Sequence, residues 1–302
     1  MFKIAGPIGG IALLISATHA ANAADMNYEQ MLGLVVSGQY ESWSGYMLYG
    51  NESGGFDPDD GTDQFVSGLS GRVSLPLGTN LSIQMDGGLE YASLFEDKKD
   101  DLFNDSFLLG THLSWRDPNS YLIGAFGAFG GGNHDLDATP ADFYAIGGEF
   151  QIYANDLTFY AQGGILEGYN DNDYLRDAFF GRGVVRWFMS PNSRLQGEFS
   201  YVDGTTDNGG DTGDTSILEW GVRYDTMIAG LPLIGDTNIF VGYRGADFDK
   251  SGTDPGGFTD HTVMVGFTRH FGANSMKDFD RVGATLDLPN FGRWVAAGEA
   301  LE

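Results

Sequence analysis

The chain has 302 residues, no cysteine, 46 glycines and 14% aromatic residues, and 42 acidic residues face only 16 basic ones, for a formal net charge of −26. This acidity argues against a nucleic-acid partner, because phosphate binding needs a basic face. The lack of cysteine excludes disulfides and thiolate chemistry. No apolar stretch of about twenty residues, the length of a transmembrane helix, lies outside the N-terminus.

The first 23 residues have the pattern of a secretory signal. Lys3 supplies the positive start, Ile4–Ile15 is a short apolar core, and Ala21-Asn22-Ala23 is a cleavage site with small residues at both ends. A buried N-terminal helix, the alternative, is disfavoured by the glycines and the proline within this core. We therefore expect export and cleavage after Ala23, with residues 24–35 as a lead-in to the folded domain.

Twelve segments then follow in which apolar and small or polar residues alternate with a period of two, as in β-strands. In Ser216–Thr226, for example, leucine, tryptophan, valine and tyrosine alternate with glutamate, glycine, arginine and aspartate. The predicted strands are Val36–Tyr49, Phe65–Leu77, Leu81–Phe95, Ser106–Arg116, Tyr121–Phe129, Phe143–Ala154, Leu157–Leu166, Phe179–Met189, Arg194–Val202, Ser216–Thr226, Asn238–Ala246 and His261–Phe271.

The connections between these strands alternate between two kinds. The short ones carry turn residues: Gly78–Asn80, Asp117–Ser120, Asn155–Asp156 and Ser190–Ser193. An apolar connection, Met227–Thr237, is the exception in this series. The long ones hold 25 of the 42 acidic residues: Gly50–Gln64, Glu96–Asp105, Gly130–Asp142, Glu167–Asp177, Asp203–Thr215 and Asp247–Asp260.

This pattern predicts an all-β protein, an antiparallel transmembrane β-barrel of about twelve strands with short periplasmic turns and long acidic extracellular loops. A soluble β-sandwich would also alternate, but its outward polar faces would be rich in lysine to protect the sheet edges, and lysine is scarce here. Aromatic residues near strand ends on the apolar face fit interfacial girdles: Tyr91, Trp115, Tyr121, Trp187, Tyr201, Trp220 and Tyr224.

With its A-x-A signal, twelve alternating strands and a last strand that contains Gly266 and ends at Phe271, the chain resembles the porin-like superfamily of bacterial outer-membrane β-barrels. The resemblance covers residues 36–271 and implies location in the outer membrane of a Gram-negative cell. It also implies that barrel-assembly machinery recognises the last strand, which we expect to close the barrel against Val36–Tyr49. The chain departs from the pattern because 31 residues follow Phe271.

These residues, 272–302, lack clean alternation, although Phe291–Leu301 has the pattern of a short amphipathic helix. We expect an accessory extension. A periplasmic position, a place inside the lumen as a plug and contact with a partner are the alternatives.

Charged residues in the inward-facing register are the candidate site. Arg182, Arg186, Arg194, Arg223 and Arg244, called the arginine row below, fall on four consecutive strands, and Arg72 and Arg116 share their orientation. Acidic residues on the other side are Asp86, Glu90 and Glu149. Opposed charges of this kind line general porins, so the resemblance and the register both predict a pore lining. The alternative is neutralisation of the arginine row by Glu198, Glu219 and Asp225.

Other chemistry has little support. Asp247, Asp249 and Ser251 copy the start of a calcium-binding loop, but the glutamate of its last position is replaced by Phe258, so solvated acidic loops are favoured over a metal site. His112 and Ser114 share the inward face at a spacing too long for a direct hydrogen bond. We expect no enzyme, and no redox cofactor or nucleotide.

The sequence therefore predicts a porin-like channel for passive diffusion of small hydrophilic solutes. A non-conducting structural or adhesive surface barrel and, less favoured, an outer-membrane lipid-modifying enzyme are the alternatives. The expected partners are outer-membrane lipids, lipopolysaccharide (with which the acidic loops share divalent cations), the assembly machinery and the solutes. Homo-oligomerisation is left open.

Overall fold

A computed structural model describes residues 36–51, 63–92, 105–133, 141–169, 174–208, 211–231, 235–251 and 256–300 of the chain. The predicted signal sequence, the lead-in 24–35 and most of the predicted extracellular connections lie outside these ranges. The described residues form twelve strands and two helices: β1 (Ser37–Asn51), β2 (Asp63–Pro76), β3 (Leu81–Ala92), β4 (Asp105–Asp117), β5 (Tyr121–Asn133), β6 (Ala141–Ala154), β7 (Leu157–Tyr169), β8 (Arg176–Ser190), β9 (Ser193–Asn208), β10 (Asp211–Leu231), β11 (Gly235–Lys250), β12 (Gly256–Phe271), α2 (Met276–Val282) and α3 (Phe291–Ala300).

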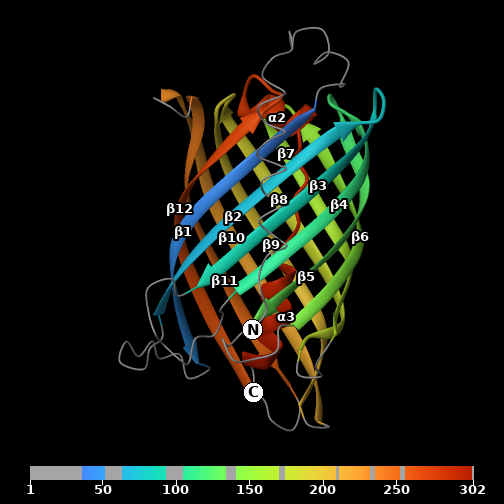
Figure 1. Cartoon of the computed structure of the whole chain (residues 1–302), viewed down its shortest axis with the longest axis vertical. Coiled ribbons are helices and arrows are strands. Elements are labelled where there is room, and N and C mark those ends of the chain that lie inside the picture. The colour runs from blue at the N-terminus through green and yellow to red at the C-terminus, as the bar shows by residue number, and fades with distance from the viewer. Residues whose placement is uncertain are drawn as a thin grey trace, which may run out of the picture.

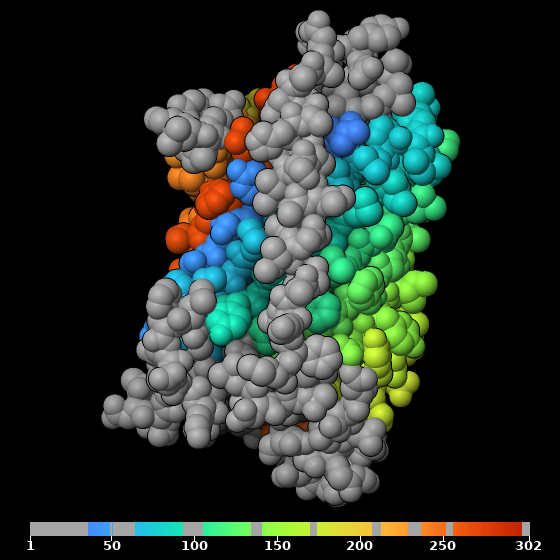
Figure 2. Space-filling view, viewed as in Figure 1, coloured from blue at the N-terminus to red at the C-terminus, as the bar shows by residue number. Residues whose placement is uncertain are grey.

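The twelve strands form one closed antiparallel barrel in which each strand pairs with its neighbours in sequence. β12 closes the ring against β1, with Phe271 opposite Gly38 and Phe258 opposite Asn51. The colours in Figures 1 and 2 show this closure, because the orange β12 lies beside the blue β1. The predicted fold class and the predicted closing strand are confirmed.

Alternation along each strand separates an apolar outer face from an inner face. In β12, Val263 and Val265 are 56% and 59% exposed on the outer face, whereas Thr262 and Thr268 are buried inside. Such an outer face is stable only against lipid, and closing the ring leaves no unpaired strand edge there. No helix among the described residues is long and apolar enough to cross a membrane.

Most strands are longer than the sequence pattern indicated, whereas the described part of β3 reaches Ala92 and not the predicted Phe95. β9 continues to Asn208, and β10 already begins at Asp211. The predicted long connection Asp203–Thr215 is therefore wrong. Thr206 and Thr215 face each other there with hydroxyl oxygens 2.9 Å apart. The sequence did not predict this extension, because its residues are polar and rich in threonine and therefore show no alternation of apolar residues. The apolar exception, Met227–Thr237, is likewise mostly strand, with a register shift between Ile228 and Leu231.

The chain turns into the barrel directly after β12. Gly272 has φ +85°, a conformation that glycine adopts without the strain of a side chain. Ser275 then caps α2, its hydroxyl accepting a hydrogen bond from the Asp278 amide at 3.0 Å. Residues 273–300 are called the C-terminal segment below. Figure 1 shows α2 at one end of the barrel and α3 inside it toward the other.

Candidate functional site: the lumen and its C-terminal segment

α2 covers the end of the barrel at which the short turns lie, called the turn end below. The Lys277 amide donates to the Pro191 carbonyl at 2.9 Å, in the turn between β8 and β9. The Arg281 guanidinium donates to the Leu157 carbonyl at 3.1 Å, next to the turn between β6 and β7. The exposed Lys277 ammonium and the Asp156 carboxylate form an ion pair at 2.7 Å, which contributes little because both groups are solvated.

The stretch between the helices crosses the middle of the lumen in extended form, and the barrel binds its backbone carbonyls. Arg116 donates to the Gly283 carbonyl at 2.8 Å. Arg72 and Gln84 both donate to the Leu286 carbonyl at 2.7 Å. These hydrogen bonds satisfy backbone groups that no strand partner reaches, which buried backbone requires.

Two members of the arginine row bind carboxylates of the C-terminal segment. Arg186 donates to the Asp280 carboxylate at 2.9 Å and to the Asp287 carboxylate at 3.1 Å. Arg182 reaches the other oxygen of the Asp287 carboxylate at 2.7 Å and pairs with Glu198 at 2.8 Å. Because Arg186 and Asp280 are almost completely buried, each is the other's main compensation for lost hydration.

Burial opposes ionisation of Asp287, but the guanidinium groups of Arg182 and Arg186 outweigh it and hold the pKa of this carboxyl well below its usual range. The two guanidinium groups therefore favour the charged form of Asp287, which is the form that binds them.

The other three members of the arginine row are neutralised by the barrel itself. Arg194 and Arg223 both bind the Asp225 carboxylate, at 3.1 and 2.7 Å. Arg223 also binds Glu41 at 2.7 Å, and Arg244 forms an ion pair with Glu90. The alternative of neutralisation thus holds for Asp225 and Glu198, and two further acids take part. Glu41 was not singled out in the sequence, whereas Glu90 was predicted on the opposite side of the pore.

The acidic side of the lumen is also occupied. Asp86 and Glu149 hold His112 between them, at 3.3 and 2.8 Å from its two ring nitrogens. Glu90 accepts a hydrogen bond from the Asn290 side chain at 2.7 Å, which ties it to the C-terminal segment. Both ring nitrogens of His112 thus bind carboxylates, so neither is free to bind a hydroxyl group.

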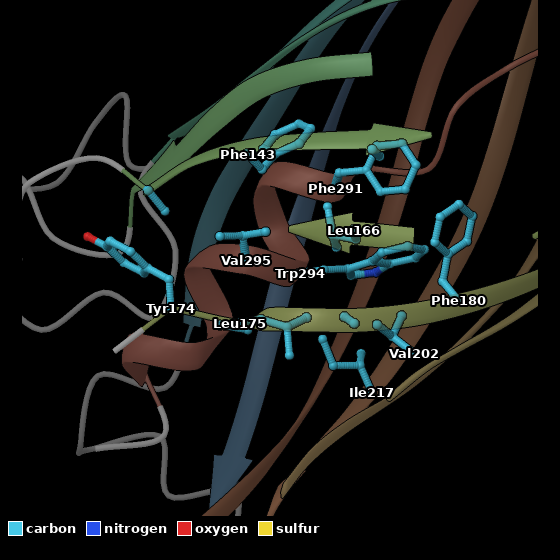
Figure 3. Packing of buried hydrophobic residues seen from close by; sticks show 14 of the residues in the cluster. Phe143, Leu166, Tyr174, Leu175, Phe180, Val202, Ile217, Phe291, Trp294 and Val295 are labelled. Carbon is cyan, nitrogen blue, oxygen red and sulfur yellow. The ribbon is translucent and has the colours of Figure 1, made fainter. Parts of the chain in front are cut away.

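α3 packs into an apolar pocket on the inner face of the barrel at the end opposite the turns. Trp294 is fully buried, with its ring 5.8 Å from that of Phe180 and 5.4 Å from that of Phe291. Its indole nitrogen donates to Glu219 at 2.8 Å, and the adjacent Arg293 pairs with Asp260. Figure 3 shows the aromatic side chains of α3 directed into this cluster.

The backbone of α3 approaches that of β5 so closely that only glycine fits. A Cβ atom on Gly132 would overlap the Gly292 carbonyl, and one on Gly292 would lie 2.6 Å from the Gly131 carbonyl. The run Gly130-Gly131-Gly132 was predicted as a loop, but it lies in β5. It is the sequence signal that most directly marks the seat of α3.

A cavity of about 280 Å³ remains between the C-terminal segment and the strands of the arginine row. Eight of the nine residues predicted to line a pore border it, and Glu149 is the exception. The eight are Arg72, Asp86, Glu90, Arg182, Arg186, Arg194, Arg223 and Arg244. Asp280 and Asp287 of the C-terminal segment border the same space, so the inner surface carries both signs of charge.

The candidate metal ligands do not form a binding loop in the described part of the chain. Asp247 and Asp249 lie in β11 with both side chains exposed, and the Asp247 carboxylate accepts a hydrogen bond from Thr259 at 3.0 Å. Ser251 follows the strand and donates through its amide to the Asp214 carbonyl at 2.9 Å. Within the described ranges, no cluster of three histidine or acidic side chains has metal-binding geometry.

No family model matches the chain, and no curated protein matches it either. Among solved structures it is similar to the COG4313 outer membrane channel from Pseudomonas putida F1, with a TM-score of 0.50 and 10% identity over 78% of this chain and 95% of that one. It is also similar to the outer membrane phospholipase (OMPLA) of Salmonella typhi, with a TM-score of 0.44 and 10% identity over 76% and 89% of the two chains. The similarity to the KdgM porin gives a TM-score of 0.42 and 10% identity over 78% and 99%. At these identities the likeness concerns the fold alone, and the chain folds as a bacterial outer-membrane β-barrel.

Proposed function

We propose that the protein is an outer-membrane channel for passive diffusion of small hydrophilic solutes, and that its C-terminal segment regulates the opening of the lumen. The observation that supports this best is the charged cavity between the segment and the arginine row. A space bordered by both signs of charge suits water and polar solutes and excludes apolar ones. The cavity already lies on the side of the lumen that the segment leaves unfilled.

Opening in this proposal requires movement of the C-terminal segment. The segment crosses the lumen from the turn end to the opposite end. Most contacts of its central stretch are polar: carbonyl contacts to Arg72 and Arg116, and contacts of the Asp287 carboxylate to Arg182 and Arg186. Its apolar contacts are fewer, and the main one is Leu286, which is buried against Leu122 and Val184. Polar contacts of this kind exchange with water when a lumen hydrates, whereas the apolar seat of α3 does not. We therefore place the mobile part between the two helices.

Conductance across planar bilayers tests the channel. We expect the full chain to give small, infrequent steps, and the variant with Asp280→Asn and Asp287→Asn to be open at least about tenfold more often, because it loses the charge that holds the segment to Arg182 and Arg186. Lys277→Ala is the matched control, since it removes an exposed ion pair of the same segment.

If neither the full chain nor the double variant conducts, although both fold, the channel function is wrong. That result would favour the non-conducting structural or adhesive barrel, which the occupied lumen also supports. An enzyme has less support among the described residues, because His112 binds two carboxylates, His270 binds Asn238 and His261 binds Tyr243. His134 lies outside the described residues.

The proposal includes export by the signal sequence with cleavage after Ala23, insertion by the barrel-assembly machinery, and contact with outer-membrane lipids and lipopolysaccharide. The apolar outer face supports contact with lipid. It also carries exposed aromatic residues near both rims, Trp115 and Trp187 toward the turns and Tyr91 and Tyr144 toward the other end, which is the distribution of interfacial girdles.

A further inference from the structure

One residue of the C-terminal segment, Asp287, is held by four side chains of the lumen. Arg182 and Arg186 donate to its two carboxylate oxygens at 2.7 and 3.1 Å. Gln162 donates to its backbone carbonyl at 2.8 Å. The Tyr160 hydroxyl lies 3.1 Å from the same carbonyl and 2.7 Å from Glu149, and either oxygen can accept its one proton. All four come from two adjacent strands, β7 and β8, and we call them the Asp287 site.

The barrel fixes the geometry of these donors independently of the segment. Arg182 donates to the Gln162 side-chain oxygen at 2.9 Å, which turns the amide nitrogen toward the Asp287 carbonyl. Both guanidinium groups lie over the Tyr160 ring, at 5.9 and 5.2 Å from its centre. The site is therefore organised by contacts that remain when the segment leaves, as a binding site requires.

The Asp287 site recognises a small chemical pattern rather than a protein surface. In an aspartate residue, two carbon atoms separate the carboxylate carbon from the carbonyl carbon. Two arginines bind the carboxylate, a fork geometry suited to this group, while a hydroxyl and an amide bind the carbonyl. The same pattern occurs in a free half-amide of a four-carbon diacid.

We propose that Asp287 occupies a solute-binding site of the channel, and that the site takes short acidic solutes with a carboxylate and a neutral carbonyl two carbons away. This inference deepens the proposed function by naming the solute class. It makes the C-terminal segment an internal competitor of the solute, because the two cannot occupy the Asp287 site together.

Glu149 makes the site favour a solute whose second group, at the position of the Asp287 carbonyl, is neutral. Its buried carboxylate accepts a hydrogen bond from the Gln162 amide at 3.2 Å and lies 2.7 Å from the Tyr160 hydroxyl, so it competes with the carbonyl for the hydroxyl proton. A second carboxylate at the carbonyl position would share these donors with Glu149, and two like charges at this distance repel strongly. A carbonyl or amide oxygen carries no such penalty. The site thus prefers a half-amide to the diacid.

The cavity gives a solute access to the carboxylate end of the site. Asp287, Arg182 and Arg186 all border it, and the Asp287 side chain is 20% exposed, against 2% for Asp280. A solute in the cavity therefore meets the two arginines before any other part of the site. By mass action, a solute that binds only the vacated site increases the population in which the central stretch has left.

The test uses the full chain with Ala284→Cys. Ala284 is fully buried in the central stretch, and the chain has no other cysteine, so the rate at which a thiol reagent modifies position 284 reports departure of this stretch. We expect sodium succinamate, the half-amide, to accelerate modification in a saturable manner. At equal ionic strength, succinate should need about tenfold higher concentration, and propionamide, which lacks the carboxylate, should have no effect.

Variants of the site distinguish binding of the solute from a general loosening of the C-terminal segment. Arg182→Gln should raise the basal rate and remove the response to succinamate. Tyr160→Phe, which loses only a hydroxyl, should fold normally and weaken the response several-fold. Arg269→Gln is the matched control, because Arg269 lies on the outer face of β12 by its alternation with exposed Val265 and Phe267, and it should change neither rate.

The inference is overturned if succinamate does not accelerate modification, if succinate or propionamide acts equally well, or if Tyr160→Phe and Arg182→Gln retain the full response. The assay needs no conductance. If the protein shows the succinamate response but never conducts, the Asp287 site is supported and the channel function is wrong. If it conducts without the response, the channel is supported and the Asp287 site is wrong.

Discussion

Replacing Arg186 with alanine is expected to release the central stretch of the C-terminal segment. The substitution should weaken the binding of this stretch to the lumen by roughly 3–5 kcal/mol. Arg186 binds Asp280 and Asp287 and also donates to the Thr285 hydroxyl at 2.9 Å. Its loss leaves the Asp280 carboxylate, which is 2% exposed, with only the more distant Arg281 at 3.9 Å as a counter-charge. Asp287 keeps only Arg182, so hydration of both carboxylates favours departure of the segment.

Hydrogen exchange of the full chain in detergent measures this effect. We expect amides 279–288 to exchange at least a hundredfold faster in Arg186→Ala, the ratio that corresponds to about 3 kcal/mol. The strands should keep their protection, because the barrel ladder does not involve the segment. Arg269→Ala removes an arginine from the outer face and serves as the control. Unchanged exchange of the segment in Arg186→Ala would contradict its role.

The second large effect is expected for Trp294→Ala, which should cost roughly 3–5 kcal/mol in the seating of α3. The indole is fully buried between Phe180 and Phe291 and donates to Glu219. Its removal leaves a cavity in a rigid barrel face, which cannot collapse around it, and leaves the Glu219 carboxylate without this donor.

This variant should affect one helix and not the other. We expect faster hydrogen exchange in 291–300 with little change in 276–282, since α2 is held at the turn end by contacts to Pro191 and Leu157. Trp187→Ala, which removes an exposed indole from the outer face, is the matched control. Equal loosening of both helices would show that the segment moves as one unit, against the proposed division between a mobile stretch and a fixed seat.

The barrel could be predicted from the sequence because its signal is local. Alternation along each strand fixes which residues face outward, so the inward orientation of the arginine row follows from the register of each strand alone, and the hydrogen bonds of Arg182, Arg194, Arg223 and Arg244 agree with it. Closure of β12 on β1 follows from the even number of strands and the need to leave no edge in lipid.

The place of the C-terminal segment could not be predicted in the same way, because its contacts join residues far apart in the chain. Arg186 meets Asp280 and Arg72 meets Leu286 without any periodic pattern that links them. An indirect signal was present. Phe180 and Ile217 face inward and are buried, which a water-filled lumen would not tolerate, and the neighbouring pair Phe179-Phe180 makes both faces of β8 apolar at that level.

The central claim is that the C-terminal segment lies inside the barrel, and protection of a single cysteine tests it most directly. Thiol modification is compared for Ala284→Cys, in the middle of the segment, and Thr79→Cys, exposed in the turn between β2 and β3. With the folded full chain in membranes, position 284 should react far more slowly than position 79, and the two should become equal after denaturation. Equal rates in the folded protein would place the segment outside the barrel and contradict the account.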